Sequence, residues 1–265
     1  MRLLNIASGS SGNSTYIGND DTHILVDAGI SRKRIVSGLH EADLDLKDLS
    51  AILITHEHID HIGGLGVLAR SLDVPIFATA GTIAGIQKCR SLGSFNQDLL
   101  VPVEAGTDFS VGNITVTPLS ISHDAADPVC FRFADDTAKA AIVTDLGEYD
   151  AQLEEQLQGL DMLMLEANHD IRMLEVGPYP YPVKQRILSR LGHLSNEASG
   201  QLLSDLLHDH IKQILLAHIS RENNTRELAH MAVCAEIDMA DNPYVAADFE
   251  VRTARPDCPA GICCT

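Results

Sequence analysis

Residues 55–64 read Thr55-His56-Glu57-His58-Ile59-Asp60-His61-Ile62-Gly63-Gly64, with three histidines and an aspartate within six positions. They follow the apolar run of residues 51–54, whose length and composition are typical of a buried strand. Imidazole and carboxylate groups are ligands that zinc, manganese and iron accept, and a short irregular turn would aim alternate side chains at two neighbouring ions. The two glycines would let the next helix begin close to the ions, because no Cβ intrudes. A solvated histidine-rich turn is the alternative interpretation.

Acidic or histidine side chains follow six of the apolar runs along the chain, within one or two positions of the end of each run. These residues are Asp27, His56, His123, Asp145, Glu166 and His218. A strand that ends at solvent accepts any polar residue, but six endings limited to Asp, His and Glu favour groups that several strands bring to one edge. The sequence therefore predicts a metal site at the ends of strands.

The 265 residues include 19 basic and 37 acidic side chains, and the formal net charge is −18. The field of so acidic a protein repels nucleic acid, so charge alone argues against a polyanionic partner. A hydrophobic content of 45% is enough for a continuous core and excludes a wholly disordered chain. No apolar run approaches the ~18 residues of a membrane span, and the sequence turns polar at Ser8 before a signal-peptide core forms, so we expect a cytoplasmic protein without a membrane partner.

Short apolar runs and segments of helical spacing predict a mixed α/β fold. The early strands come in hairpin-like pairs and the later ones alternate with helices, so we expect two sheets. A capping box at residues 224–227 predicts a helix that runs toward Asp238. No linker rich in Pro, Gly or Ser divides the chain, so residues 1–265 are predicted to form a single domain. Residues 256–265, which contain Cys258, Cys263 and Cys264, are expected to be a mobile tail of free thiols.

The motif and its neighbours resemble the metallo-β-lactamase-fold hydrolases, in which a His-x-His-x-Asp-His motif follows a strand. That motif here runs from His56 to His61, with Asp27 upstream and His123 and Asp145 downstream. The resemblance covers nearly the whole chain, and it narrows to the YycJ-like (WalJ) branch on five further segments: residues 7–14, 122–128, 166–170, 192–197 and 217–224. It implies an αββα sandwich of two mixed β-sheets flanked by helices, with the active site at one edge of the paired sheets.

The resemblance also implies two divalent metal ions per chain, either zinc or manganese, with iron as an alternative. The ligands of the first ion would be His56, His58 and His123. Those of the second would be Asp60, His61 and His218, with Asp145 bridging the two. Asp27 would hold the histidine-rich turn by hydrogen bonds rather than touch an ion.

Paired divalent ions lower the pKa of a shared water, so a metal-bridging hydroxide would be the nucleophile in an in-line attack on a phosphate. Asp60 would help to orient that water or accept its proton. His193 would act as the general acid on the leaving oxygen, and Glu166 would pair with it and hold it protonated. A structural surface histidine is the alternative for His193. Ser195 and Asn196 would donate hydrogen bonds to a non-bridging phosphate oxygen at a helix start.

The sequence thus predicts a dinuclear-metal phosphodiester hydrolase, and the resemblance implies a DNA exonuclease. A hydrolase of a cyclic phosphodiester, thioester or lactone is the second hypothesis, although a thiolate leaves without the dedicated acid that His193 would supply. The third hypothesis is a metal-dependent binding module without catalysis. Such a module would lack some of the metal-ligand residues, and none of them is missing from this sequence. Two bound ions would add a charge of +4, so a local cationic pocket would bind phosphate despite the acidic chain.

Stacking groups for a nucleic acid are scarce, since the chain has 5 Tyr, 6 Phe and no Trp. We therefore expect a short or terminal substrate rather than long single-stranded RNA. Together with the resemblance, this implies DNA ends or a small phosphodiester. Tyr179 and Tyr181, in a proline-rich stretch, are candidates to stack on a base, with packing in a turn as the alternative.

Overall fold

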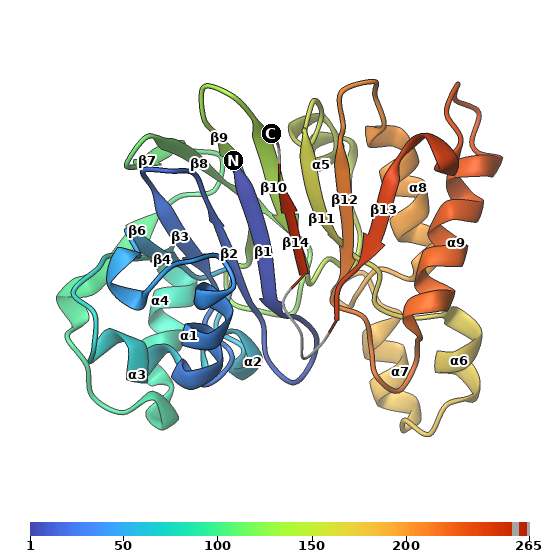
Figure 1. Ribbon diagram of the computed structural model, residues 1–265. Coiled ribbons are helices and arrows are strands. Elements are labelled where there is room, and N and C mark those ends of the chain that lie inside the picture. The colour runs from blue at the N-terminus through green and yellow to red at the C-terminus, as the bar shows by residue number, and fades with distance from the viewer. Residues whose placement is uncertain (256–259, 264–265) are drawn as a thin grey trace.

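The computed structural model describes residues 1–255 and 260–263, which contain two packed seven-stranded β-sheets (Figure 1). In order across the first sheet the strands are β14 (Ala260–Cys263), β1 (Arg2–Ala7), β2 (Ser14–Gly18), β3 (His23–Val26), β4 (Ala51–Leu53), β5 (Ile76–Thr79) and β6 (Leu100–Val103). Across the second they are β13 (Glu250–Thr253), β12 (Gln213–Ala217), β11 (Met162–Glu166), β10 (Lys139–Val143), β9 (Val129–Ala134), β8 (Ile114–Ser120) and β7 (Phe109–Val111).

Both sheets are mixed, with an antiparallel part and a parallel part. Strands β3 to β6 pair in parallel in the first sheet, and β10 to β13 do so in the second. The strands β1 and β2, and β7 to β9, pair antiparallel as the hairpin-like runs predict. Because parallel strands end at the same edge, the residues that follow β10, β11 and β12 come together there.

Helices cover the outer face of each sheet, so the four layers form the predicted αββα sandwich. The α-helices are α1 (Arg32–His40), α2 (Ile59–Ile62), α3 (Leu65–Ala69), α4 (Ala80–Lys88), α5 (Ala151–Gln156), α6 (Ile171–Val176), α7 (Tyr181–Ile187), α8 (Asn196–Leu206) and α9 (Arg226–Met239). Figure 1 shows α1 to α4 beside the first sheet and α8 and α9 beside the second. Short 3₁₀ helices lie at Leu46–Asp48, Arg90–Leu92, Gln97–Leu99 and Ala246–Asp248.

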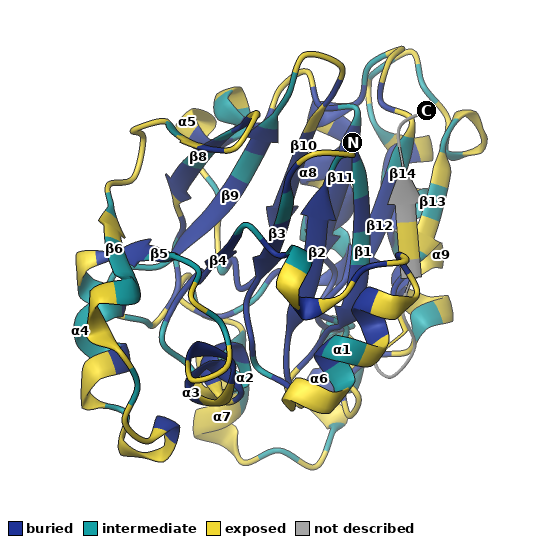
Figure 2. Ribbon diagram, turned by 60° about the vertical axis from the view of Figure 1, so that its left-hand side comes forward, coloured by how far each residue is buried: buried dark blue, intermediate teal, exposed yellow. Residues whose placement is uncertain are grey.

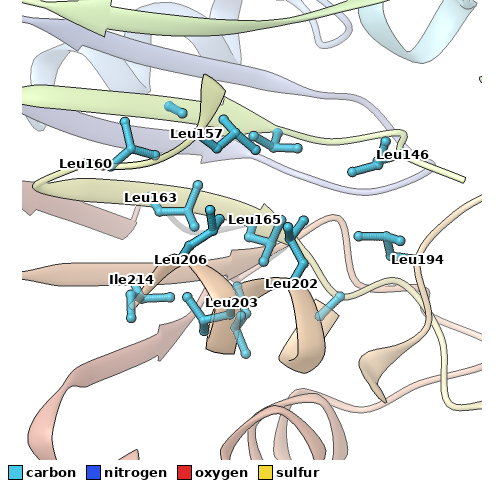
Figure 3. Close-up of a cluster of buried hydrophobic side chains, with 14 of the residues drawn as sticks. Leu146, Leu157, Leu160, Leu163, Leu165, Leu194, Leu202, Leu203, Leu206 and Ile214 are labelled. Atoms are coloured by element: carbon cyan, nitrogen blue, oxygen red, sulfur yellow. The ribbon is translucent and has the colours of Figure 1, made fainter. Parts of the chain in front are cut away.

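The central strands, such as β4, β11 and β12, are apolar on both faces and buried on both sides (Figure 2). In β11, Met162 and Met164 face the other sheet, whereas Leu163 and Leu165 belong to the core under the helices. This alternation has the period of two that a strand requires. Figure 3 shows Leu163 and Leu165 packed against leucines of α8. Burial on both faces explains why the sequence shows continuous apolar runs rather than alternating ones.

Phe131, in the core between the sheets, is completely buried. We expect Phe131→Ala to lower the free energy of unfolding by about 3–5 kcal/mol, because it removes buried ring surface and leaves a cavity. Urea denaturation of the metal-free protein measures this. Val245→Ala, at an exposed position, is the control and should change stability by less than about 0.5 kcal/mol. An equal effect of the two substitutions would contradict the assignment of Phe131 to the core.

Two sequence-based predictions about the C-terminal part can be compared with the structure. The capping box correctly predicts helix α9, but its N-cap is Thr225, whose side chain accepts a hydrogen bond from the Leu228 amide. The expected mobile tail is corrected for Ala260–Cys263, because these residues form β14 and pair antiparallel with β1. Cys258 and Cys264 lie outside the described residues. Within residues 1–255 and 260–263, no helix has both the length and the apolar composition to cross a bilayer.

Candidate metal and catalytic centre

Three predicted site residues in a left-handed backbone conformation lie within two positions of a strand end. Asp27 and His218 directly follow β3 and β12, and Asp145 follows β10 after one residue, Thr144. The φ angle is 60° at Asp27 and Asp145 and 54° at His218. Among the described residues only one other non-glycine residue, Asp43, has a positive φ. This conformation costs roughly 1–3 kcal/mol for each residue and concentrates at functional sites. Here it turns the chain sharply at the end of each strand, where the site lies.

Asp27 holds the histidine-rich turn through a set of buried hydrogen bonds. Its carboxylate accepts from the amide of Thr55 at 2.9 Å and from the Thr55 hydroxyl at 2.9 and 3.1 Å. Its Oδ2 also lies 2.8 Å from Nδ1 of His61. With Nδ1 donating to Asp27, the Nε2 atom of His61 carries the lone pair. These are the contacts expected of a residue that orients a ligand.

A close backbone contact fixes the other end of the turn. A Cβ on Gly64 would lie 2.1 Å from the carbonyl oxygen of Ile30. The predicted need for glycine at this position is therefore correct. Its reason is the close approach of this backbone oxygen, and the two glycines let α3 begin three residues after the end of α2.

His56, His58 and His123 form the first group of ligand atoms, all within 4.8 Å of one another. Nδ1 of His58 and Nε2 of His123 face each other at 3.3 Å, and Nδ1 of His123 is engaged by the carbonyl of Gly192 at 3.1 Å. Nε2 of His56 is buried and has no hydrogen-bond partner among the described residues. Burial lowers the pKa of His56 well below its ordinary value, so its ring is neutral and offers a lone pair.

Asp60, His61 and His218 form a second group with the same spread of ligand atoms. Nε2 of His61 lies 3.7 Å from Oδ2 of Asp60. The two groups meet at Asp145. Its oxygens lie 3.2 Å from Nε2 of His61, 3.5 Å from Nε2 of His218 and 3.8 Å from Nε2 of His123. Asp145 therefore stands where a bridging ligand is predicted.

The donor set fits divalent metal ions. Two ligands at the usual ~2.0–2.1 Å from a tetrahedral ion lie about 3.3 Å apart, which is close to several of the separations here. Oδ2 of Asp145 and Nε2 of His56 are buried and take part in no hydrogen bond with a described residue. A buried polar atom without a partner costs about 1–3 kcal/mol, and a bound cation removes that cost. These residues are thus suited to binding metal ions.

Glu166, completely buried at the end of β11, connects His193 and His218. Its Oε1 lies 2.8 Å from Nδ1 of His193 and 3.0 Å from Nδ1 of His218, and its Oε2 accepts from the Leu146 amide at 2.8 Å. Burial raises the pKa of Glu166. The charges and hydrogen bonds of His193 and His218 lower it by a larger amount, so the pKa of Glu166 is about 2. Glu166 is therefore an anion that orients both rings.

His193 is partly exposed, with 18% of its side chain accessible to solvent. Burial lowers its pKa, but the charge and hydrogen bond of Glu166 outweigh burial and raise the pKa above its ordinary value. Because Nδ1 is engaged by Glu166, Nε2 is the atom that is left to meet a substrate. This geometry suits a proton donor at the mouth of the site.

The structure corrects the predicted role of Asn196. Its side chain is completely buried and exchanges hydrogen bonds of 2.8 and 3.1 Å with the side chain of Asn224, so it has no access to a substrate. Ser195 caps α8 by accepting from the Ala198 amide at 3.2 Å. Its contact with substrate stays a prediction.

Two features of the site are absent from the sequence-based prediction. Asn13, in the hairpin between β1 and β2, places Nδ2 2.9 Å from Nε2 of His61 and 3.5 Å from Oδ2 of Asp60. Asp124 lies with Oδ1 3.7 Å from Nε2 of His58, and Arg186 of α7 forms a two-point ion pair with it. Asn13 and Asp124 lie within residues 7–14 and 122–128, two of the segments on which the family resemblance rests. Their place in these segments is the sequence signal that could have identified them.

Asp27→Asn tests the orienting contact. The amide cannot accept from both His61 and Thr55 as the carboxylate does, so a buried donor loses its partner. We expect the free energy of unfolding to fall by about 1–3 kcal/mol and metal affinity to fall by about 10- to 100-fold. Urea denaturation of the metal-free protein and competition with a chelator measure the two effects. Asp43→Asn is the control, because Asp43 is exposed and has a similar φ; unchanged metal affinity in Asp27→Asn would refute the orienting role.

Comparisons with known proteins identify the family of this chain. Residues 22–219 match the family model for the β-lactamase superfamily domain. An exodeoxyribonuclease YycJ of Bacillus anthracis is 38% identical over 97% of this chain and 96% of its own length. An exodeoxyribonuclease WalJ of Streptococcus pneumoniae is 40% identical over 95% and 93%, respectively.

Solved structures support the fold. The metallo-β-lactamase-fold protein YhfI of Bacillus subtilis aligns with a TM-score of 0.71 at 17% identity and covers 98% of this chain and 99% of its own. The Zn²⁺-bound PqqB of Methylobacterium extorquens aligns with a TM-score of 0.72 at 16% identity over the whole of both chains. The chain belongs to the metallo-β-lactamase-fold branch of the β-lactamase superfamily and, within it, to the YycJ-like (WalJ) group.

Proposed function

We propose that this chain is a metal-dependent phosphodiester hydrolase that removes nucleotides from DNA ends. The observation that carries this proposal is the pair of His193 and buried Glu166, 2.8 Å apart, beside the ligand groups that Asp145 connects. A phosphodiester needs a proton on its leaving alkoxide, whereas a thioester does not. The pair would supply that proton.

The residues that would hold two metal ions, zinc or manganese, are His56, His58 and His123 for one and Asp60, His61 and His218 for the other, with Asp145 shared. Bound divalent ions would polarise the phosphate and lower the pKa of the attacking water. Asp60 has 24% of its side chain accessible, so it would also orient that water. Asp27 would keep His61 in its required orientation.

His193 would transfer the proton of Nε2 to the oxygen that leaves the phosphorus, and Glu166 would stabilise the protonated ring before that step. The same carboxylate would keep the ring of His218 in place through Nδ1. Ser195, at the start of α8, would donate its hydroxyl to a non-bridging phosphate oxygen. These roles divide the site into groups that hold metal and one group that moves a proton.

DNA is the proposed substrate because the full-length relatives YycJ and WalJ are named as exodeoxyribonucleases. The net charge of −18 does not oppose this, because two bound ions would add +4 at the site itself. Binding would therefore depend on a few local phosphate contacts, with a shallower salt dependence than a basic nuclease shows.

The test is to incubate the manganese- or zinc-loaded protein separately with end-labelled duplex DNA, single-stranded DNA, RNA and a chromogenic thioester. We expect mononucleotides or short products from a DNA end. Cleavage of the thioester alone would refute the proposal and favour a small-molecule hydrolase. Stable binding of every substrate without turnover would favour a binding module.

A further inference from the structure

A basic and apolar hairpin lies beside the site on a chain that is otherwise strongly acidic. We define the α6–α7 hairpin as residues 171–191. It contains four basic side chains, Arg172, Lys184, Arg186 and Arg190, and one acidic side chain, Glu175, so its formal charge is +3. The chain as a whole carries −18. The local charge next to the proposed phosphate site is thus opposite in sign to that of the whole chain.

The hairpin also exposes apolar side chains. Among the described residues eleven large hydrophobic side chains are exposed, and five of them belong to the hairpin. Val176 is 86% exposed and Tyr181 is 73% exposed. Monomeric proteins rarely gather exposed apolar groups in this way unless the surface binds something. The ring of Tyr181, in the proline-rich stretch, is therefore exposed to solvent and is not packed in a turn.

The hairpin is joined directly to the catalytic residues. It begins after Glu166 and ends before His193, whose amide donates to the carbonyl of Ile187 at 3.1 Å. The hydroxyl of Ser122, beside His123, donates to the carbonyl of Arg190 at 2.7 Å. Figures 1 and 2 show α6 and α7 at the same end of the two sheets as α2. The surface is thus continuous with the site.

Arg186 marks the point where the hairpin reaches the site. It pairs with Asp124, whose Oδ1 lies 3.5 Å from Nε2 of His123. The carboxylates of Asp124, Asp60 and Asp145 together raise the pKa of Arg186, so its guanidinium lies within the field of the site. Lys184 donates to the carbonyl of Glu175 at 2.7 Å and thereby connects α7 to the end of α6.

We propose that the α6–α7 hairpin binds the unpaired strand of a DNA end, with a base stacked on Tyr181 and phosphates bound by Arg172 and Lys184. This inference rests on the proposed function and names the surface that leads the strand to it. Cations track the phosphates of a single strand, and an exposed aromatic ring stacks on its bases without regard to sequence. The backbone of a duplex would use the cations but would leave Tyr181 without a role.

The test compares two double variants in which one arginine and one lysine are neutralised. Arg172→Gln/Lys184→Gln alters the hairpin. Lys88→Gln/Arg90→Gln alters two exposed residues, the last residue of α4 and the first residue of the 3₁₀ helix Arg90–Leu92, and is the matched control. The probe is a fluorescent 12-nucleotide DNA strand with phosphorothioate linkages, bound to the metal-loaded protein over a range of salt concentrations. A blunt duplex of the same length is the second arm.

We expect the hairpin variant to bind the single strand at least tenfold more weakly and to reduce the slope of log affinity against log salt by about 1.4, since each lost phosphate contact removes about 0.7. Tyr181→Ala should weaken single-strand binding by about tenfold. For both variants the rate on single-stranded DNA should fall at least tenfold relative to the rate on bis(p-nitrophenyl) phosphate. The control should keep the wild-type ratio and slope.

Wild-type affinity and slope in the hairpin variant would overturn the inference. Equal losses for strand and duplex, with no effect of Tyr181→Ala, would overturn the assignment to an unpaired strand. Hydrolysis of the small diester by the wild-type protein without cleavage of any DNA would instead refute the proposed function, and this result is distinguishable because it concerns the unaltered protein.

Discussion

Replacing Asp145 with alanine is expected to remove at least one metal ion per chain and to lower DNA hydrolysis by at least about 10³-fold. Asp145 is 2% exposed, and its two oxygens lie within 3.8 Å of histidines from both ligand groups. No other carboxylate among the described residues belongs to a ligand group together with His56. Its removal therefore leaves the two groups without a shared anion.

The φ of 60° at Asp145 adds a complication, because alanine tolerates this conformation poorly. Asp145→Asn separates the two effects, since asparagine accepts the left-handed conformation and keeps the shape while losing the charge. We expect Asp145→Asn to lose metal as well. Asp43→Ala, with a φ of 58° at an exposed position, has the backbone penalty alone and should keep full metal content.

Elemental analysis of the purified variants gives the number of ions per chain, and end-labelled DNA gives the rate. Two retained ions in both Asp145 variants would show that Asp145 does not bridge. Metal lost in Asp145→Ala but kept in Asp145→Asn would assign the loss to the backbone rather than to the carboxylate charge.

The positions of six site residues could be predicted because each follows an apolar run, and parallel strands of a sheet end at one edge. Asp27, Asp145 and His218 illustrate this, as they follow strands far apart in sequence. The family resemblance supplied what the spacing did not, namely which ligand group each histidine joins. The apolar runs predicted a mixed α/β fold with two sheets, and the αββα sandwich was predicted from the family resemblance.

Other parts of the site depend on tertiary contacts that leave no local pattern. The residues next to Asn196 in the sequence do not indicate that its side-chain amide exchanges two hydrogen bonds with that of Asn224. This pairing is the reason that Asn196 cannot contact a substrate. The amide of Asn13 meets His61 across a distance of 48 residues in sequence. The pairing of β14 with β1 joins the C-terminal residues to the N-terminal ones, so composition alone could not predict it.

Replacing His193 with alanine is expected to lower the hydrolysis of DNA by roughly 10²-fold or more while both metal ions remain bound. His193 lies 3.7 Å from Asp145 and 2.8 Å from Glu166, but its partial exposure places it at the mouth of the site, outside the two predicted ligand groups. The loss of activity in His193→Ala would thus come from impaired proton transfer and not from loss of metal. Elemental analysis and DNA turnover are the two measurements, and His230→Ala, an exposed histidine on α9, is the control.

A change of leaving group tells a proton donor from a residue that only supports the metal ligands. The p-nitrophenolate ion leaves without a proton, whereas the alkoxide of a nucleotide needs one. The variant should therefore lose much less activity on bis(p-nitrophenyl) phosphate than on DNA. An equal loss on both substrates would mean that His193 positions the metal ligands, and its assignment as general acid would then be wrong.

Glu166→Gln cannot replace this experiment, because Glu166 contacts two histidines of different function. Its Oε1 lies 2.8 Å from His193 and 3.0 Å from His218, so the substitution would disturb the proton donor and a proposed metal ligand together. We expect Glu166→Gln to lose activity on both substrates and to bind metal more weakly, about 10- to 100-fold. The contrast between a leaving-group-dependent loss in His193→Ala and a general loss in Glu166→Gln is what separates the chemical step from the support of the metal site.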